Sequence, residues 1–153
     1  MQSVNEVVSG GQTGVDRAAL DVAQELGIPC GGWCPQGRRA EDGIIPDRYP
    51  LQETPGKNYN IRTEKNVRDS DATLILNLGP LEGGTALTVE IAKRLHRPCL
   101  VVELEKAPDP AAVREWLRNH QIRKLNIAGP RESKWPGIQK SAAAFLRLVL
   151  PSS

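Results

Sequence analysis

Short apolar segments alternate with amphipathic segments along the whole chain, and this alternation restricts the fold more than any other feature. Apolar segments that predict strands lie at residues 4–8, 28–33, 72–78, 98–103 and 124–128. Amphipathic segments that predict helices lie at residues 15–26, 60–69, 85–94, 108–120 and 137–150. Strands that alternate with helices form a parallel sheet covered on both faces. We therefore predict an α/β, Rossmann-like three-layer domain with a mainly parallel five-stranded sheet.

The length and charge of the chain narrow the class of protein. A chain of 153 residues is typical of one domain, so we expect residues 1–153 to form a single unit. A net charge of +2 and an aromatic content of 4% argue against a nucleic-acid partner. Without a signal-like start or an apolar stretch of 18 residues, we expect a soluble, cytoplasmic protein with no membrane partner. Three sparse cysteines fit reduced thiols.

The order of the strands within the sheet determines where a ligand would bind. Two orders are natural for five such strands, 2-1-3-4-5 and 3-2-1-4-5. We favour the first, because strand 72–78 is apolar throughout and would then lie beside strand 4–8. Open α/β sheets bind ligands beyond the carboxyl ends of their strands, where the strand order reverses. In the favoured order this point lies between the first and third strands.

Glycine-rich turns follow those same two strands. The first turn contains Gly10, Gly11, Gln12, Thr13 and Gly14, and the second contains Gly83, Gly84 and Thr85. Glycine lets a ligand approach the backbone, and the first turn of a helix has unpaired N–H groups that attract anions. Val15 and Asp16 stand where a P-loop needs lysine and a hydroxyl, which argues against ATP hydrolysis. We predict one anion cradle, although a tight turn without a ligand and a simple N-cap at Thr85 remain alternatives.

Several basic residues are candidates to neutralise a bound anion. The candidates are Arg38, Arg39, Arg62, Lys65, Arg68 and Arg131. We select Arg38, Arg62 and Arg131, because a guanidinium donates paired hydrogen bonds to phosphate. Asn66 lies one helical turn after Arg62 and shares its face, so it is predicted to hydrogen-bond the ligand. The alternatives are a solvated Arg38 and a purely structural Arg62 and Asn66.

Signatures of catalysis and of metal binding are weak. His96 and His120 have no spaced partner, and no Ser-His-Asp set is visible. Cys30 and Cys34 lack the second ligand pair of a structural zinc site. Cys34 lies in a loop where it could contact a soft metal within a ligand, and a plain thiol is the alternative. We predict no catalytic residue and no metal ligand.

Five motifs, in order along the chain, resemble the molybdenum cofactor carrier proteins, relatives of the lysine-decarboxylase-like nucleotide-binding proteins. They are Ser9-Gly10-Gly11-Gln12-Thr13-Gly14-Val15-Asp16-Arg17, Pro35-Gln36-Gly37-Arg38-Arg39-Ala40-Glu41-Asp42-Gly43, Arg62-Thr63-Glu64-Lys65-Asn66-Val67 with Asp69-Ser70-Asp71, Gly83-Gly84-Thr85, and Ala128-Gly129-Pro130-Arg131-Glu132-Ser133. The resemblance implies a carrier that binds and protects molybdenum cofactor, a phosphorylated pterin that holds molybdenum, at the glycine-rich turns. It also implies a homo-oligomer, with molybdoenzymes as recipients of the cofactor.

One departure separates this chain from enzymes of the wider superfamily. Phosphoribohydrolases that cleave nucleoside monophosphates carry a Pro-Gly-Gly-x-Gly-Thr-x-x-Glu motif, whereas here Thr88 stands three residues after Thr85. Loss of that glutamate favours a binding protein without turnover. The alternatives are a hydrolase that recruits Glu64 or Glu90 as acid and base, and a sensor of a nucleotide derivative.

Overall fold

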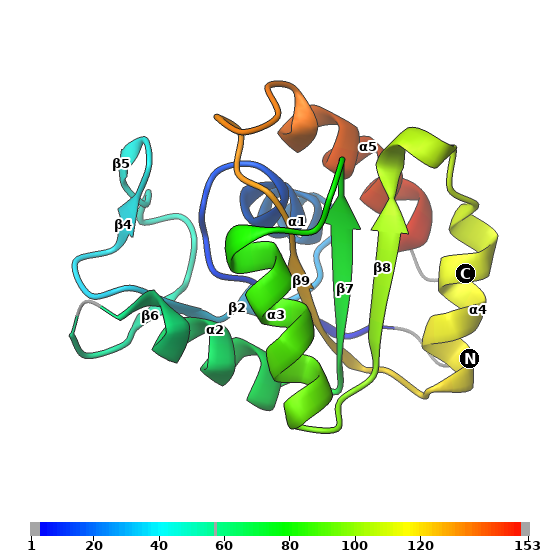
Figure 1. Ribbon diagram of the computed structural model, residues 1–153, viewed down its shortest axis with the longest axis horizontal. Helices are drawn as coiled ribbons and strands as arrows, with labels where there is room; N and C mark the ends of the chain where they lie inside the picture. The colour runs from blue at the N-terminus through cyan, green and yellow to red at the C-terminus, as the bar shows by residue number, and fades with distance from the viewer. Residues whose placement is uncertain (1–3, 57, 151–153) are drawn as a thin grey trace.

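The computed structural model describes residues 4–56 and 58–150 (Figure 1). The central sheet contains β1 (Glu6–Val8), β2 (Cys30–Gly31), β7 (Ala72–Asn77), β8 (Cys99–Glu103) and β9 (Lys124–Ala128). The helices are α1 (Val15–Glu25), α2 (Tyr59–Arg68), α3 (Gly83–Arg94), α4 (Pro110–Asn119) and α5 (Ile138–Val149), with a 3₁₀ turn η1 (Leu104–Lys106). The predicted α/β class, parallel sheet and helix positions are confirmed.

The strand order differs from both predicted orders. The strands lie in the order β2-β1-β9-β7-β8, and every neighbouring pair is parallel. The last strand, β9, therefore lies in the centre, where Val7 pairs with Leu125 and Leu74 pairs with Ile127. The prediction failed because β9 contains Lys124 and Asn126 and is no more apolar than its neighbours, so nothing local marks it as a central strand.

The observed order becomes a familiar one if the chain is started at a different point. Counted from β9 as the first strand, the sheet reads 3-2-1-4-5, the less favoured of the two predicted orders. Val4 and Leu150, the first and last described residues, both belong to the main hydrophobic core. The fold is therefore a Rossmann-like arrangement in which the final strand, β9, supplies the centre of the sheet and the final helix, α5, packs against α1.

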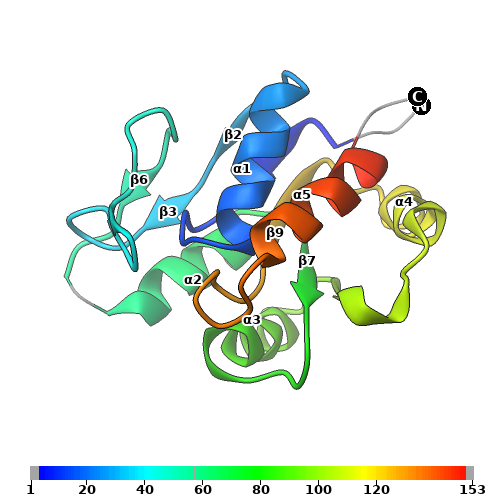
Figure 2. The same ribbon diagram turned by 90° about the horizontal axis from the view of Figure 1, so that it is seen from above.

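The two faces of the sheet are covered unequally. α1, α4 and α5 pack on one face over the large main core, and α2 and α3 lie on the other (Figure 2). The core beneath α2 and α3 contains only Val67, Ile91 and Ala92 as fully buried members. This face is therefore the one with room for a cleft.

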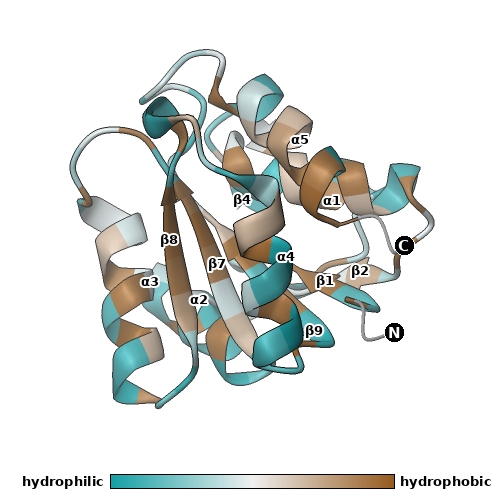
Figure 3. Ribbon diagram, turned by 90° about the vertical axis from the view of Figure 1, so that its right-hand side faces the viewer, coloured by the Kyte–Doolittle hydropathy of each residue, from teal (hydrophilic) through white to brown (hydrophobic). Residues whose placement is uncertain are grey.

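The apolar residues of β8 predict burial on both sides, and this is wrong. It is an edge strand whose residues Cys99, Leu100 and Val101 are only half-buried. Figure 3 shows that hydrophobic residues make up most of this edge.

The predicted strand 28–33 is interrupted at Gly32. Gly32 has φ +134°, and a Cβ there would lie 2.2 Å from the Ser9 carbonyl oxygen. The chain therefore leaves the main sheet, and β3 (Trp33–Cys34) pairs in parallel with β6 (Gln52–Glu53). Between them, β4 (Arg39–Ala40) and β5 (Gly43–Ile44) form a small antiparallel hairpin. Residues 33–53 thus form a folded excursion with its own small core around Tyr49 and Ile45.

Candidate functional site

A cleft of about 420 Å³ opens at the carboxyl ends of β1 and β9. Its walls come from α2, from the N-terminus of α3, and from the β4–β5 hairpin. Of the residues predicted to bind the ligand, those that line it are Gly10, Gln12, Arg62, Asn66, Gly83, Gly84, Thr85 and Arg131. The two glycine-rich turns therefore reach the same cleft, with β9 between the strands that precede them.

The glycines of the first turn make room for protein atoms. A Cβ at Gly10 would lie 1.7 Å from Arg62 Nη1, and one at Gly14 would lie 2.3 Å from the Pro130 carbonyl oxygen. At Gly11 it would meet the Leu51 side chain. The space that these glycines leave is thus occupied by other atoms of the protein and is not open to a ligand.

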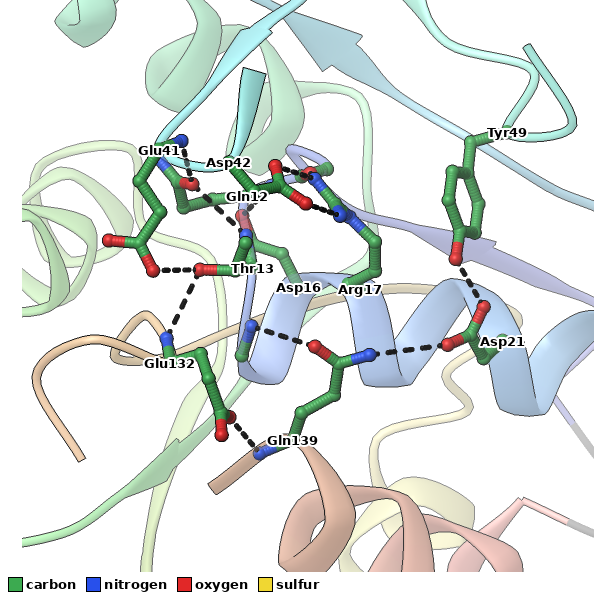
Figure 4. A network of polar contacts seen from close by, with 12 residues as sticks. Gln12, Thr13, Asp16, Arg17, Asp21, Glu41, Asp42, Tyr49, Glu132 and Gln139 are labelled. Carbon is green, nitrogen blue, oxygen red and sulfur yellow. Dashed lines mark hydrogen bonds and ion pairs between the residues drawn. The ribbon is translucent and has the colours of Figure 1, made fainter. Parts of the chain in front are cut away.

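The start of α1 is capped from within the protein (Figure 4). The Val15 N–H donates to the Pro130 carbonyl at 3.2 Å, and the Gly14 N–H donates to Gln139 Oε1 at 3.3 Å. The Gln12 N–H donates to Asp16 Oδ2 at 3.3 Å. The N–H groups expected to receive an anion at this turn are therefore largely satisfied.

The start of α3 is different. No side chain among the described residues caps it, and a Cβ at Gly83 or Gly84 would have no neighbour within 4 Å. Thr85, expected as a possible cap, lies inside the helix and is buried. The open backbone N–H groups of the cleft are consequently those of the second glycine turn.

Arg62 reaches the floor of the cleft and faces Asp16. Their side chains are 17% and 8% exposed, and Arg62 Nη1 lies 3.5 Å from Asp16 Oδ2. Arg62 Nε is buried without a hydrogen-bond partner among the described residues. Burial raises the pKa of Asp16, and the charge of Arg62 opposes that rise. Arg62 therefore has hydrogen-bond donors that remain unpaired within residues 4–56 and 58–150, and its contact with the Asp16 carboxylate is long.

The two other cations of the cleft are also paired with carboxylates. Arg131 Nε lies 3.7 Å from Glu41 Oε1, and the Lys134 ammonium contacts Glu82. The cleft lining thus contains three cations and three carboxylates in three pairs. An anionic ligand would gain its charge contacts by exchange with these carboxylates.

The comparisons with known proteins cover almost the whole chain. The family model described as the circularly permutated YpsA SLOG family matches residues 7–150. The chain belongs to this family. A crystal structure of a “putative molybdenum carrier protein” from Syntrophus aciditrophicus SB is 47% identical, with a TM-score of 0.93. The match covers 97% of this chain and 96% of that one. No curated protein gives a significant match.

The permutation in the family name agrees with the topology described above. In this member of the YpsA SLOG family, β9 and α5 close the chain but occupy the position of a first strand and helix. The permutation also brings the segment 129–136, which follows β9, against the first glycine turn, where Pro130 caps α1.

Two residues predicted to contact the ligand are instead hydrogen-bonded to the backbone in this member of the circularly permutated YpsA SLOG family. Arg38 lies outside the cleft, and its guanidinium donates to the carbonyls of Ile45, Pro46, Tyr49 and Leu51. Asn66 lines the cleft, but its amide exchanges two hydrogen bonds with the Trp33 backbone, at 2.7 and 3.0 Å. Both side chains therefore hold the excursion 33–53 in place. Gly11, Thr13 and Gly14 also lie outside the cleft lining.

The other basic candidates do not line the cleft. Lys65 Nζ lies 4.5 Å from the Trp33 ring centroid, and Arg68 pairs with Glu64. Sequence reasoning missed Lys134, Glu82 and Tyr59 as cleft residues. Lys134 directly follows the predicted motif 128–133. Its closeness in sequence to Arg131 is the signal that could have identified it as a cleft residue.

Thiol and imidazole groups are absent from the lining of the cleft as described. Cys34 is fully buried in the small core with Ile45 and Tyr49, and burial raises the pKa of its thiol. Among residues 4–56 and 58–150, no cluster of three histidine, cysteine or acidic side chains is placed to hold a metal.

Proposed function

We propose that this protein is a carrier that binds a phosphorylated pterin, most specifically molybdenum cofactor, in the cleft without turnover. The observation that supports this most is the uncapped start of α3, with two glycines open to the cleft, in the same cleft as the half-buried Arg62. Helix N-terminal N–H groups and a guanidinium with an unpaired donor are complementary to a phosphate. The relative named as a molybdenum carrier supports the choice of cargo.

The cleft fits such a cargo in size and chemistry. A volume of about 420 Å³ lies within the range that accepts one ordinary small molecule. Tyr59, 48% exposed, lines the cleft and offers an aromatic face to a flat ring. Because the lining has no thiol, the molybdenum would remain on the dithiolene of the pterin, and the protein would contact the phosphate and the ring. The cofactor is cargo in this proposal, and the chain supplies binding and shielding.

We propose a cytoplasmic homo-oligomer that passes its cargo to molybdoenzymes. No helix in the described parts of the chain is long and apolar enough to cross a membrane.

The experiment that tests the carrier is a titration of the purified protein with molybdenum cofactor, with AMP and molybdate as separate competitors. Replacing Gly84 with valine should weaken cofactor binding by about 100-fold or more, because the added side chain would fill the space through which the phosphate approaches the backbone. Gly84 has no neighbour within 4 Å, so we expect the fold to be kept.

Ala86→Val is the matched control, because it adds bulk at a position two residues later that does not line the cleft. We expect it to bind the cofactor as the wild type does. Unchanged affinity in Gly84→Val would refute the assignment of the phosphate to α3.

A second candidate function is cleavage of the N-glycosidic bond of a nucleoside monophosphate. Glu64 and Glu90, the acids considered for it, lie outside the cleft lining, but Asp16 is a buried carboxyl within it. Burial raises the pKa of Asp16, as a general acid requires. If the enzyme exists, AMP should yield free adenine and ribose phosphate, and Asp16→Asn should stop the reaction. AMP that binds without products would instead indicate a sensor.

A further inference from the structure

The Glu41 carboxylate is bound by the protein as an external anion would be. Its Oε2 accepts hydrogen bonds from the Thr13 hydroxyl and, at 3.0 Å, from the Ser133 N–H. Its Oε1 accepts one from the Ser133 hydroxyl at 2.5 Å and lies 3.7 Å from Arg131 Nε. The side chain is 21% exposed and belongs to the lining of the cleft. Figure 4 shows its contact with Thr13.

These donors come from two turns that are far apart in the sequence. Thr13 follows β1, whereas Arg131 and Ser133 follow β9, and the Thr13 hydroxyl also accepts a hydrogen bond from the Glu132 N–H at 3.2 Å. Burial at the rim opposes ionisation of Glu41, but the hydrogen bonds from Ser133 and Thr13 and the charge of Arg131 outweigh it and lower its pKa. The set of two hydroxyls, one backbone N–H and one guanidinium is therefore organised for a negative group.

The hairpin that carries Glu41 has no buried residue between Arg39 and Ile44. Its strands β4 and β5 contain two residues each, and Ile44 is 75% exposed. Its other polar anchors are the Glu41 N–H, which donates to Gln12 Oε1 at 2.8 Å, and the Asp42 carboxylate, which accepts two hydrogen bonds from Arg17, at 2.7 and 3.1 Å. The chain is firmly fixed again at Ile45, which is fully buried. A segment with few buried residues can open locally while the rest of the fold stays intact.

We propose that Thr13, Arg131 and Ser133 form an oxyanion subsite at the rim of the cleft, and that Glu41 occupies it as an internal substitute for a tetrahedral oxyanion. An incoming phosphate or molybdate group displaces the Glu41 carboxylate and lifts the hairpin 39–44 from the rim. When the cleft is loaded, the ligand's anionic group replaces the Glu41 carboxylate in the subsite. The charge of Arg131 is therefore paired before and after binding. This inference rests on the proposed function only in placing the ligand in the same cleft.

Titration with inorganic phosphate tests the subsite directly. Glu41→Ala should bind phosphate at least about tenfold more tightly than the wild type, because the wild-type subsite is free only in the small population with the hairpin open. In the wild type, saturating phosphate should speed amide hydrogen exchange within residues 39–44. Equal affinity of the two proteins for phosphate and also for molybdate, or hydrogen exchange that neither anion changes, would overturn the proposal. Glu41→Gln, which keeps the shape but removes the charge, should also gain affinity and guards against a folding defect in the alanine variant.

Three further variants distinguish the rim subsite from a merely loosened hairpin and from phosphate binding at α3. Asp42→Asn weakens the hairpin through its contact with Arg17 but leaves Glu41 in the subsite, so it should not gain the affinity. Adding Thr13→Val and Ser133→Ala to Glu41→Ala should remove the gain. In the background of Gly84→Val the gain should persist, even if cofactor binding is lost there. A gain that disappears with Gly84→Val would place the phosphate at α3 and refute the rim subsite, whereas the carrier proposal would stand.

A repeat with molybdate identifies which end of a cargo the subsite accepts. Tighter binding of phosphate by Glu41→Ala assigns it to the phosphate, and tighter binding of molybdate assigns it to the oxo-metal group. Either gain supports the subsite.

Discussion

Replacing Arg62 with methionine should lower the free energy of unfolding by about 3–5 kcal/mol at neutral pH. Methionine fills much of the volume of arginine, so the loss comes from charge. Asp16 would remain in the floor of the cleft, with its side chain 8% exposed and its cationic partner gone. The hydrogen bond from the Gln12 N–H and the smaller effect of the Arg17 charge cannot compensate for a buried carboxylate. Urea denaturation of the variant and the wild type measures the difference.

The same variant should show a distinctive dependence on pH. Burial raises the pKa of Asp16 in the folded protein, so its contribution to stability is greatest when it is protonated and falls as the pH rises through the folded pKa. Without the charge of Arg62 that pKa rises further. The difference in unfolding free energy between wild type and Arg62→Met should therefore be smaller at about pH 4 than at neutral pH. The double variant with Asp16→Asn should lose this dependence, and a constant difference across pH would show that Asp16 does not carry the cost.

Replacing Gly14 with alanine should destabilise the protein by about 4 kcal/mol or more. Gly14 has φ +83° and ψ −131°, a region that residues with a side chain rarely adopt. The new Cβ would also lie 2.3 Å from the Pro130 carbonyl oxygen and 2.8 Å from Arg131 Cα. Because both neighbours are backbone atoms, the segment after β9 would have to move away from α1.

Gly27→Ala provides the matched control. Gly27 has φ +72°, but a Cβ there would meet nothing within 4 Å. We expect a cost of about 1–2 kcal/mol, from the backbone conformation alone. Thermal or urea unfolding of the two variants separates strain from collision. Equal losses of unfolding free energy in the two variants would mean that the turn after β9 moves away from the turn after β1 at no cost in free energy.

The sequence predicted the positions of the helices and strands well, but it did not predict which strands lie side by side in the sheet. Helical spacing located α1 to within a residue at its end, because its apolar residues recur at positions 15, 18, 19, 22 and 23. The same kind of local pattern could not place β9, whose central position depends on pairing with β1 and β7 across long stretches of chain. Likewise, nothing local to residue 32 shows that the Ser9 carbonyl approaches it and bends the chain out of the sheet.

For the site, the sequence identified the right turns but not the state of their donors. Both glycine turns reach the cleft, yet only Gly83 and Gly84 leave open space, because the first turn is filled by Arg62, Leu51 and Pro130. Arg38 was a reasonable phosphate ligand by residue type. Its carbonyl partners exist only once residues 45–51 have folded around it, so no spacing in the sequence could reveal them.

The central position of β9 bears on how the domain is made. A ribosome delivers β1, β2, β7 and β8 before the strand that joins them, so the nascent chain carries two separate parallel pairs, β1–β2 and β7–β8. Until residues 124–128 emerge, β1 and β7 each have an unpaired edge that is open to association with other chains. Completion of the sheet is therefore a late step with large sequence separation, which slows folding. A nascent chain stalled before β9 is accordingly a natural client for chaperones that shield strand edges.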